Sequence, residues 1–206
     1  NECDVLIAVG MRFDDRVTGR LDTYAKQAKI IQLDIDGSEI NKNVKVDVPV
    51  IGNCKKTLSL LTALVNEARH TEWIDSFAAY EKAEYDRVIR REIHPVSGPL
   101  HMGEVVDAVS EAVDHDAVLV TDVGQNQMMA ARYFKFSRCR SMVTSGGLGT
   151  MGFGLPAAVG CTFARPERTV CVFMGDGGLQ MNLQEFGTIM EQRAPVKMIL
   201  LDNNYL

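Results

Sequence analysis

Two polar residues follow two apolar stretches of this chain, 27 positions apart. Asp176 comes after "TVCVFMG" and precedes Gly177 and Gly178, and Asn203 comes after "VKMILLD". Apolar runs of this length are typical of buried parallel strands, which bind ligands at their carboxyl ends. Glycines let backbone N–H groups close on a phosphate, a helix start adds partial positive charge, and a carboxylate beside a diphosphate requires a divalent cation between them. Taken singly, Asp176 caps a helix and Asn203 starts a turn; as a pair they predict a Mg²⁺–diphosphate site.

A glycine-rich segment, "GLGTMGFGLPAA", offers a second interpretation of the same region. It contains the G-x-G-x-x-G spacing of a dinucleotide fingerprint at Gly147, Gly149 and Gly152. Such a fingerprint follows a buried strand directly, whereas the preceding "FSRCRSMVTS" carries two arginines. Asp176 lies at a suitable distance to hold a ribose, but the glycines after it would have no role. An NAD-dependent dehydrogenase therefore stays as an alternative from a different class.

Apolar runs and helical patterns alternate along the whole chain. Strands are expected at 4–10, 29–36, 46–53, 117–124, 140–146, 169–177 and 196–204. Helices are expected at 54–68, 69–92, 101–113, 125–134, 155–164 and 179–192. This alternation predicts an α/β fold of two partial doubly wound, mostly parallel-sheet domains.

The expected domains are unequal in size. Residues 1–68 would be the second half of one domain, 69–98 a helical linker, and 99–206 the first part of another, with the boundary near residue 95 in "REIHPVSGPLHMG". The chain starts in one strand and stops just after another, so we expect a fragment of a longer protein.

Composition narrows the class of partner. The 206 residues carry a net charge of −5, which gives no basic face for nucleic acid. No apolar run approaches the roughly 20 residues of a membrane span. Five cysteines without a C-x-x-C pair indicate free thiols, make a zinc site improbable, and favour a cytoplasmic protein.

Six segments together resemble the thiamine diphosphate enzymes, and among these the large catalytic subunit of the acetolactate synthases. The resemblance covers nearly the whole chain and is carried, in order, by "VGMRFDDRVTG", "DIDGSEINKN", "VTDVGQNQM", "GGLGTMGFGLPAA", "MGDGGLQMN" and "LDNNYL". It implies three cofactors: thiamine diphosphate, Mg²⁺ and FAD.

The resemblance implies a role for each residue of the diphosphate site. Asp176 and Asn203 would be the side-chain Mg²⁺ ligands, with the main-chain carbonyl of Tyr205 as a third. Asp202 departs from the family, which has Asn there. The other residues expected at the cofactor are Gln125, Asn126, Gly149, Thr150, Met151, Gly177 and Gly178.

Two of these positions bear on the catalytic step. Gln125 and Asn126 fall where the family contacts the diphosphate and the substrate end, and a His is common in place of Asn126. Met151 would hold the cofactor in its bent form, with Gly149 letting the backbone approach the aminopyrimidine ring. Ordinary core filling is the alternative for Met151, because methionine fills irregular gaps well.

The first segments resemble the family's FAD-binding half-domain, where the flavin has a largely structural role. The implied flavin residues are Gly10, Arg12, Phe13, Asp14, Asp34, Ile35 and Asn53. Asp would be more typical than Asn53. Asp15 and Arg16 would lie at the approach to the active site. The alternative is a solvated loop in which these charges pair with one another.

The implied reaction decarboxylates pyruvate and joins the two-carbon unit to pyruvate or 2-oxobutyrate, in branched-chain amino acid biosynthesis. The implied assembly is a homodimer or tetramer with a regulatory small subunit, in which a glutamate of a separate domain activates the cofactor. No residue here matches that glutamate, so the fragment alone should be inactive. Other carboligases or 2-keto acid decarboxylases of the superfamily, and a non-catalytic oligomerisation module, are the remaining alternatives.

Overall fold

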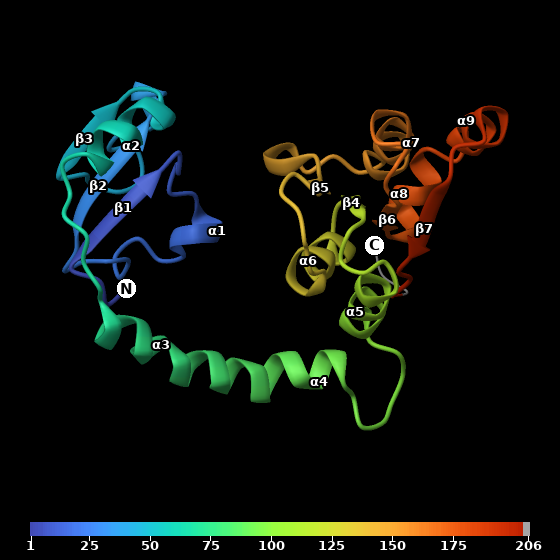
Figure 1. Cartoon of the computed structure of the whole chain (residues 1–206), viewed down its shortest axis with the longest axis horizontal. Helices are drawn as coiled ribbons and strands as arrows, with labels where there is room; N and C mark the ends of the chain where they lie inside the picture. Colours follow the sequence, from blue (N-terminus) through green and yellow to red (C-terminus); the bar gives the residue numbers. More distant parts are fainter. Residues whose placement is uncertain (204–206) are drawn as a thin grey trace. The chain divides into compact units, whose positions relative to one another are not determined.

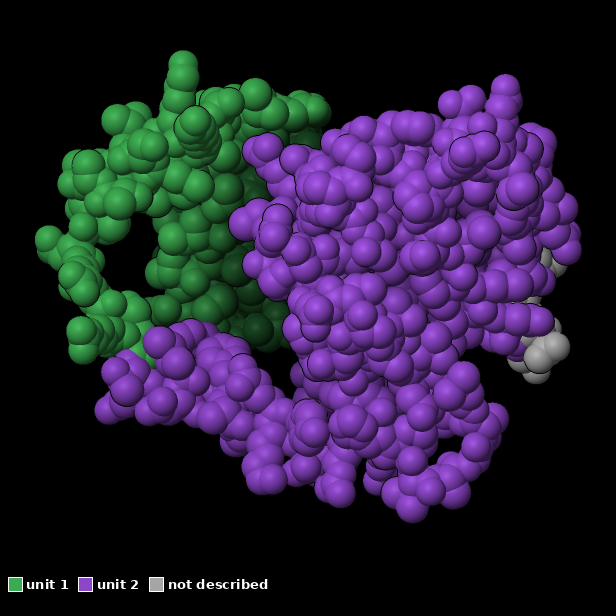
Figure 2. All heavy atoms as spheres, turned by 45° about the vertical axis from the view of Figure 1, so that its right-hand side comes forward, with its two compact units in different colours: residues 1–70 green, residues 71–206 purple. Residues whose placement is uncertain are grey.

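The computed structural model describes residues 1–203 and separates the chain into two compact units, residues 1–70 and 71–206 (Figure 2). This division lies close to the expected end of the first domain at residue 68, and not near residue 95. The helical segment after residue 70, expected to be a linker, belongs to the second unit because it packs there: α4 (Arg90–Ile93) contacts α5 (Met102–Ala112), and Glu84 forms an ion pair with Arg132.

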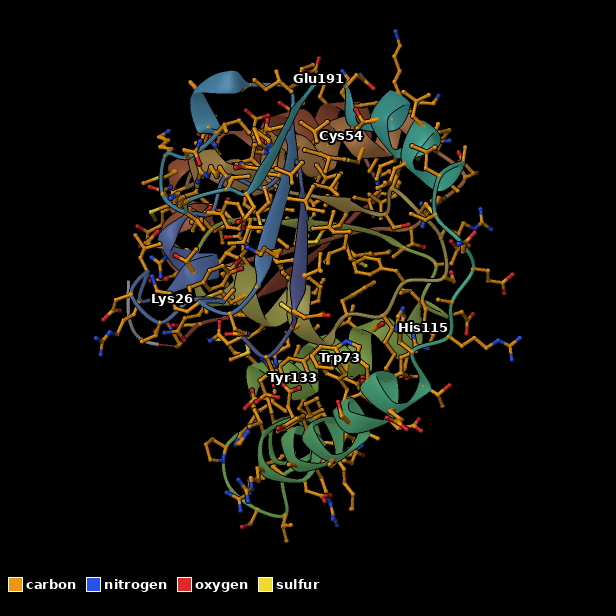
Figure 3. All side chains as sticks on the ribbon, turned by 90° about the vertical axis from the view of Figure 1, so that its left-hand side faces the viewer. Lys26, Cys54, Trp73, His115, Tyr133 and Glu191 are labelled. Atoms are coloured by element: carbon orange, nitrogen blue, oxygen red, sulfur yellow. The ribbon has the colours of Figure 1, made fainter. Side chains whose placement is uncertain are left out.

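The first unit is a three-stranded parallel sheet in the order β1-β2-β3. Its elements in chain order are β1 (Val5–Val9), α1 (Asp15–Thr18), β2 (Lys29–Asp34), a 3₁₀ turn (Gly37–Glu39), β3 (Val48–Ile51) and α2 (Cys54–Thr62), as Figure 1 shows. The small core under one face consists of Ala8, Phe13, Ile30 and Val46. Cys54, labelled in Figure 3, begins α2.

The second unit begins with a long helical segment. It runs through α3 (Thr71–Glu84), one π-helical turn (Tyr85–Ile89) and α4 (Arg90–Ile93). Trp73 lies on α3 and Tyr133 at the end of α6 (Figure 3). α3 has no buried residue, so it contributes little to the core.

The second sheet is also parallel, in the order β5-β4-β6-β7. Its strands are β4 (Val118–Thr121), β5 (Met142–Val143), β6 (Val170–Met174) and β7 (Val196–Leu200). Every residue of β4 and β6 is buried, as expected for central strands covered on both faces. Two parallel sheets confirm the predicted α/β fold class.

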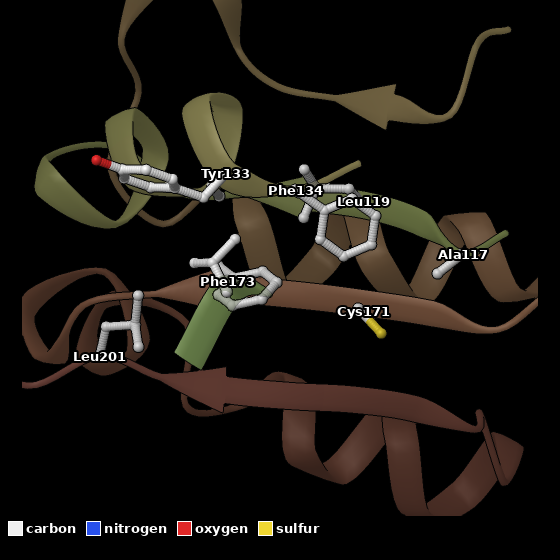
Figure 4. Close-up of a cluster of buried hydrophobic side chains, with 9 residues drawn as sticks. Ala117, Leu119, Tyr133, Phe134, Cys171, Phe173 and Leu201 are labelled. Atoms are coloured by element: carbon white, nitrogen blue, oxygen red, sulfur yellow. The ribbon is translucent and has the colours of Figure 1, made fainter. Parts of the chain in front are cut away.

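Helices cover both faces of this sheet (Figure 1). They are α5 (Met102–Ala112), α6 (Gln125–Tyr133), α7 (Gly154–Ala164), α8 (Asp176–Met181) and α9 (Glu185–Gln192). Alternate strand residues point to the two faces: Leu119 and Phe173 pack with α5 and α6, whereas Val120 and Val172 pack with α7. Figure 4 shows the first of these clusters.

The strand order places a crevice at the site. After β4 the chain moves outward to the edge strand β5, and then returns to form β6 on the other side of β4. Ligands of open α/β sheets bind where the strand order reverses, beyond the carboxyl ends of the two strands. In this unit that point lies beyond β4 and β6.

One expected helix is divided. The segment 179–192 was expected to be a single helix, but α8 ends at Met181 and α9 begins at Glu185. The break lies at Asn182, whose backbone is no longer helical, with φ −133°. Its side-chain amide donates to the carbonyl of Gly152, so a contact far away in sequence stabilises the interruption.

Candidate functional site

A cavity of about 240 Å³ lies at the carboxyl edge of the second sheet, at the crevice between β4 and β6. Its walls come from the segments that follow β4, β6 and β7, from the glycine-rich segment and from α5. They comprise Met102, Val123, Gly124, Gln125, Asn126, Met151, Gly175, Asp176, Gly177, Gly178, Leu201 and Asn203.

Both residues of the predicted metal-binding pair line this cavity. Asp176 follows β6 and Asn203 follows the neighbouring strand β7. The Nδ2 of Asn203 donates to Oε1 of Gln125 over 3.1 Å, which ties the end of β7 to the start of α6. Tyr205, the expected third ligand, lies outside the described residues.

The segment after β6 brings backbone close to the cavity. Gly175, Gly177 and Gly178 contribute no side chains there, and a Cβ at Gly178 would overlap Oδ1 of Asp122. The following helix, α8, has only six residues, so the partial positive charge of its dipole at the N-terminus is that of a short helix. An anion bound here would therefore depend on backbone N–H groups rather than on the dipole of a long helix.

Asn126 lies in the wall with an unsatisfied acceptor. It is 5% exposed and its Nδ2 donates to the carbonyl of Val123 over 3.1 Å. Its buried Oδ1 has no hydrogen-bond partner among residues 1–203. A buried amide oxygen without a donor is costly, so a bound group or water that donates to it would be favoured.

The glycine-rich segment reaches the cavity through one residue. Met151 lines the wall and is 41% exposed, so it is not simply filling the core. Gly149 and Thr150 precede it outside that wall. Gly149 has φ +58°, and the Thr150 N–H donates to Oγ of Ser145 over 2.9 Å.

The same segment does not have the structure of a dinucleotide fingerprint. It follows β5, a two-residue strand at the edge of the sheet, instead of a central buried strand. The first helix after it, α7, begins only at Gly154. The geometry that a dehydrogenase requires is therefore missing at this position.

Sequence reasoning missed Asp122, whose side chain contacts both the glycine-rich segment and the segment after β6. Asp122 is 1% exposed and follows β4 just as Asp176 follows β6. A carboxylate directly after a buried strand was the available signal, although Asp122 lies beside the wall and is not part of it. The wall residues also missed are Met102, Val123, Gly124, Gly175 and Leu201.

The expected flavin residues lie at the carboxyl edge of the first sheet. Gly10 follows β1, Asp34 ends β2 and Asn53 follows β3. The Gly10 N–H donates to the carbonyl of Leu33 over 2.8 Å, which holds the edge together. Ile35 is 71% exposed there, and Asp34 is buried.

In the loop after β1, the prediction that the Phe13 side chain lines the flavin is wrong. Phe13 is 2% exposed and packs in the core of the first unit, so its side chain does not line a ligand surface and only its backbone could do so. Arg12 pairs with Asp14 over 3.1 Å, and this guanidinium holds the pKa of Asp14 below its ordinary value. Part of the predicted self-paired loop is thus present. Asp15 and Arg16 are exposed beside it.

A larger cavity in the first unit lies elsewhere. It measures about 500 Å³ and is lined by the start of β2 and the segment before β3, including Lys26, Lys29 and Lys45. These residues lie at the amino ends of the strands. None of the expected flavin residues lines this cavity.

Within residues 1–203, no three His, Cys, Asp or Glu side chains gather as a metal centre. A Mg²⁺ held by one carboxylate, one amide and phosphate oxygens would not be of that kind. All five cysteines are free, as expected, and Cys161 is half-buried. No helix among the described residues is long and apolar enough to cross a membrane.

Two family models match this chain. Residues 1–61 match the central domain of the thiamine pyrophosphate enzymes, and residues 122–206 match their C-terminal TPP-binding domain. Relatives with similar sequences over the whole chain include the probable acetolactate synthase large subunit of Methanococcus aeolicus and the large subunit of Haemophilus influenzae, each 40% identical. The isozyme 2 large subunit of Escherichia coli is 43% identical. The chain covers 36% of each of these proteins, about a third of their length.

Proposed function

Because the chain belongs to the thiamine pyrophosphate enzyme family, we propose that its second unit binds thiamine diphosphate through Mg²⁺ in the cavity between β4 and β6. The observation that carries this proposal is that Asp176 and Asn203 line one cavity, after neighbouring strands. A carboxylate and an amide oxygen are hard ligands suited to Mg²⁺, which takes its remaining oxygens from phosphate and water.

The described residues fit such a group. The wall around Asp176 is formed by glycines, whose backbone can approach a diphosphate closely. The buried Oδ1 of Asn126 accepts no hydrogen bond within residues 1–203 and can accept one from a bound molecule. The cavity therefore offers a cation site, room for an anion and an acceptor within one wall.

Each wall residue has a distinct role in this proposal. Asp176 and Asn203 hold the metal, with the carbonyl of Tyr205 as third ligand. Gly177 and Gly178 present backbone to the diphosphate, and Gln125 orients Asn203 through their 3.1 Å hydrogen bond. Asn126 accepts a hydrogen bond near the substrate end.

The glycine-rich segment forms the other side of the site. Met151, in the cavity wall, would support the cofactor, and Gly149 and Thr150, which precede it outside the wall, would let the backbone approach the cofactor's ring. When bound, thiamine diphosphate supplies the carbon that adds to a 2-keto acid and the electron sink for loss of CO₂. The surrounding residues keep water out of the site while this occurs.

We infer that the whole protein is an acetolactate synthase. It would decarboxylate pyruvate and transfer the two-carbon unit to pyruvate or 2-oxobutyrate, in branched-chain amino acid biosynthesis. The relatives named as acetolactate synthase large subunits, 40–43% identical over the entire chain, support this proposal. The proposed form is a cytoplasmic homodimer or tetramer with a regulatory small subunit, in which another copy supplies the activating glutamate.

We also propose that the carboxyl edge of the first sheet binds FAD. The loop after β1 is held ready for a ligand, because Gln32 Nε2 donates to the carbonyl of Met11 and Asn43 Nδ2 donates to that of Arg12, over 3.0 and 3.2 Å. A loop fixed by hydrogen bonds from residues distant in sequence loses little entropy on binding. The role of the flavin would be structural.

The test measures thermal unfolding of the full-length protein, with any residues that its gene encodes before and after this chain. Thiamine diphosphate with Mg²⁺ should raise the unfolding temperature, and either component alone should raise it less. In Asp176→Asn the Mg²⁺ concentration for half the effect should rise at least about tenfold, because a charged ligand is lost. Asp114→Asn is the control, since Asp114 is exposed, lies outside the cavity wall and has φ +51°, which asparagine tolerates.

The outcomes separate the alternatives. Stabilisation by NAD, without any by thiamine diphosphate and Mg²⁺, would overturn the proposal in favour of a dehydrogenase. No response to either ligand would favour an oligomerisation module. Formation of 2-acetolactate from pyruvate, measured on the same protein, distinguishes an acetolactate synthase from other carboligases and decarboxylases.

A further inference from the structure

The backbone of Gly152, next to Met151 in the cavity wall, is held at its N–H and at its carbonyl by side chains of other elements. Its N–H donates to Oδ1 of Asp122 over 3.1 Å, and its carbonyl accepts from Nδ2 of Asn182. Asp122 follows β4 and Asn182 follows α8. The two partners therefore join the glycine-rich segment to the end of β4 and to the end of α8.

Asp122 makes more than this one contact. Its Oδ1 also accepts from the Val123 N–H over 3.0 Å, and its Oδ2 accepts from the Gly154 N–H over 2.8 Å. In the part of the chain that the structure describes, this buried carboxylate takes part in no ion pair. Three backbone N–H groups thus stabilise the carboxylate by hydrogen bonding.

The carboxylate of Asp122 also lies at the start of a helix. Gly154 is the first residue of α7, an eleven-residue helix whose N-cap, Phe153, offers no side-chain cap. Asp122 supplies that cap from 32 positions away and places negative charge at the positive end of the helix. One carboxylate therefore fixes both the start of α7 and the peptide group before it.

Asn182 has a defined orientation. Its Nδ2 faces the carbonyl of Gly152, and its Oδ1 accepts from Nε2 of Gln184 over 2.8 Å. These two partners require the amide to lie one way round. Gly152 itself has φ +80°, and a Cβ there would lie 2.8 Å from Nδ2 of Asn182. Only glycine fits between the two clamping side chains.

We propose that Asp122 and Asn182 are positioning residues that clamp the backbone of Gly152, at its N–H and its carbonyl, and so hold Met151 in the cavity wall. Neither residue lines the cavity itself. The clamp stands on the hydrogen bonds above, whereas its effect on ligand binding rests on the proposed function. Loss of either partner should loosen residues 147–154 while leaving the sheet folded.

The test follows backbone amide hydrogen exchange of peptides covering 147–155, in the protein with all of its encoded residues and without ligand. Asp122→Asn keeps the size of the side chain but removes its charge and one acceptor, and Asn182→Ala removes the other contact. Each should speed exchange of this segment about tenfold or more, because a buried hydrogen bond holding it closed is lost. In the double variant the effects should combine non-additively, since both side chains bind the backbone of the same residue.

Two control variants separate a local clamp from general destabilisation. Arg168→Ala removes hydrogen bonds to the carbonyls of Asp116 and Ala117, at the opposite end of β4, so it should destabilise the unit without speeding exchange at 147–155. Gly160→Ala adds a methyl group in α7 with nothing within 4 Å, and should leave exchange unchanged. The clamp is refuted if Asp122→Asn and Asn182→Ala exchange like wild type, or if Arg168→Ala loosens the segment equally.

A second measurement addresses the ligand. The half-saturating concentration of thiamine diphosphate, at fixed excess Mg²⁺, should rise about tenfold in Asp122→Asn and in Asn182→Ala. Unchanged half-saturation in variants with faster exchange would overturn the positioning role. If the wild-type protein shows no response to thiamine diphosphate, the proposed function fails, and the exchange data still decide whether the clamp exists.

Discussion

Asp122 and Asp176 show how two identical side chains at the ends of neighbouring strands lie in different surroundings. Each follows a central strand of the second sheet, yet Asp122 is 1% exposed whereas Asp176 lies half-buried in the cavity wall. The difference comes from the backbone that faces them. Asp122 meets N–H groups 30 and 32 positions further along the chain, which stabilise its carboxylate by hydrogen bonding. Asp176 lines the cavity, where we propose that it binds Mg²⁺.

This contrast explains which site residues sequence reasoning could find. Asp176 was identified because its glycine neighbours and the matching Asn203 form a recognisable spacing. Asp122 and Asn182 were missed because their partners lie about 30 residues away, and no local pattern shows which loop will fold against them. The burial of Phe13 was missed for the same reason.

The thiol of Cys171 provides a prediction at this scale. Cys171 is 1% exposed in β6, and burial raises its pKa to about 11, whereas Cys139 is exposed. Iodoacetamide at pH 8 should therefore label Cys139 and leave Cys171 unlabelled in the folded protein, because the thiolate is the reacting form. Mass spectrometry of the cysteine peptides measures this, with urea-unfolded protein as the control.

The sign of the pH effect follows from the raised pKa. A folded-state pKa above the ordinary value means that the neutral thiol is favoured by folding. Its contribution to stability is complete below about pH 9 and falls as the pH rises towards the folded pKa near 11. Rapid labelling of Cys171 at pH 8, without unfolding, would contradict the buried position of this thiol.

At the scale of elements, α2 depends on its cap. Asn53 accepts from the backbone N–H groups of Lys55 and Lys56 over 3.1 and 3.4 Å, and no residue of the helix is buried. Asn53→Ala should weaken α2 by about 1 kcal/mol, whereas Asn53→Asp should keep the cap. Amide exchange of residues 54–62 measures the difference. Equal protection in the alanine and aspartate variants would show that the cap contributes nothing.

Most helices and strands could be predicted from the sequence, because their residue patterns are local. β4 and β6 are uninterrupted apolar runs because both of their faces are covered, and this signal needs no partner to be recognised. The predicted end of α2 was wrong: the helical pattern in the sequence continues to residue 68, but the helix ends at Thr62. Leu64 and Val65 are 82% and 58% exposed beyond it, so apolar spacing without a surface to pack against did not extend the helix.

At the scale of the whole molecule, the chain carries two separate sheets with separate cores. Unit 1 packs around Phe13 and Ile30, and unit 2 around clusters on both faces of its own sheet. The two family models fall one in each unit, residues 1–61 and 122–206. Each unit also presents its candidate ligand residues at the carboxyl edge of its own sheet. The proposed cofactors should therefore act on different units.

This separation leads to a prediction that hydrogen exchange can map. Thiamine diphosphate with Mg²⁺ should protect peptides covering 122–126, 150–154 and 175–178, because ligand binding to the folded state suppresses local opening. FAD should instead protect 10–14, 34–36 and 53–57, at the edge of the first sheet. At a ligand concentration of about 100 Kd the stabilisation of each unit is about 2.7 kcal/mol, which is large enough to detect. The measurement compares both ligands, singly and together, on the same protein. Protection of the first unit by thiamine diphosphate, or of the second by FAD, would show that the sites are wrongly assigned, since residues 1–203 place the two candidate edges in different sheets.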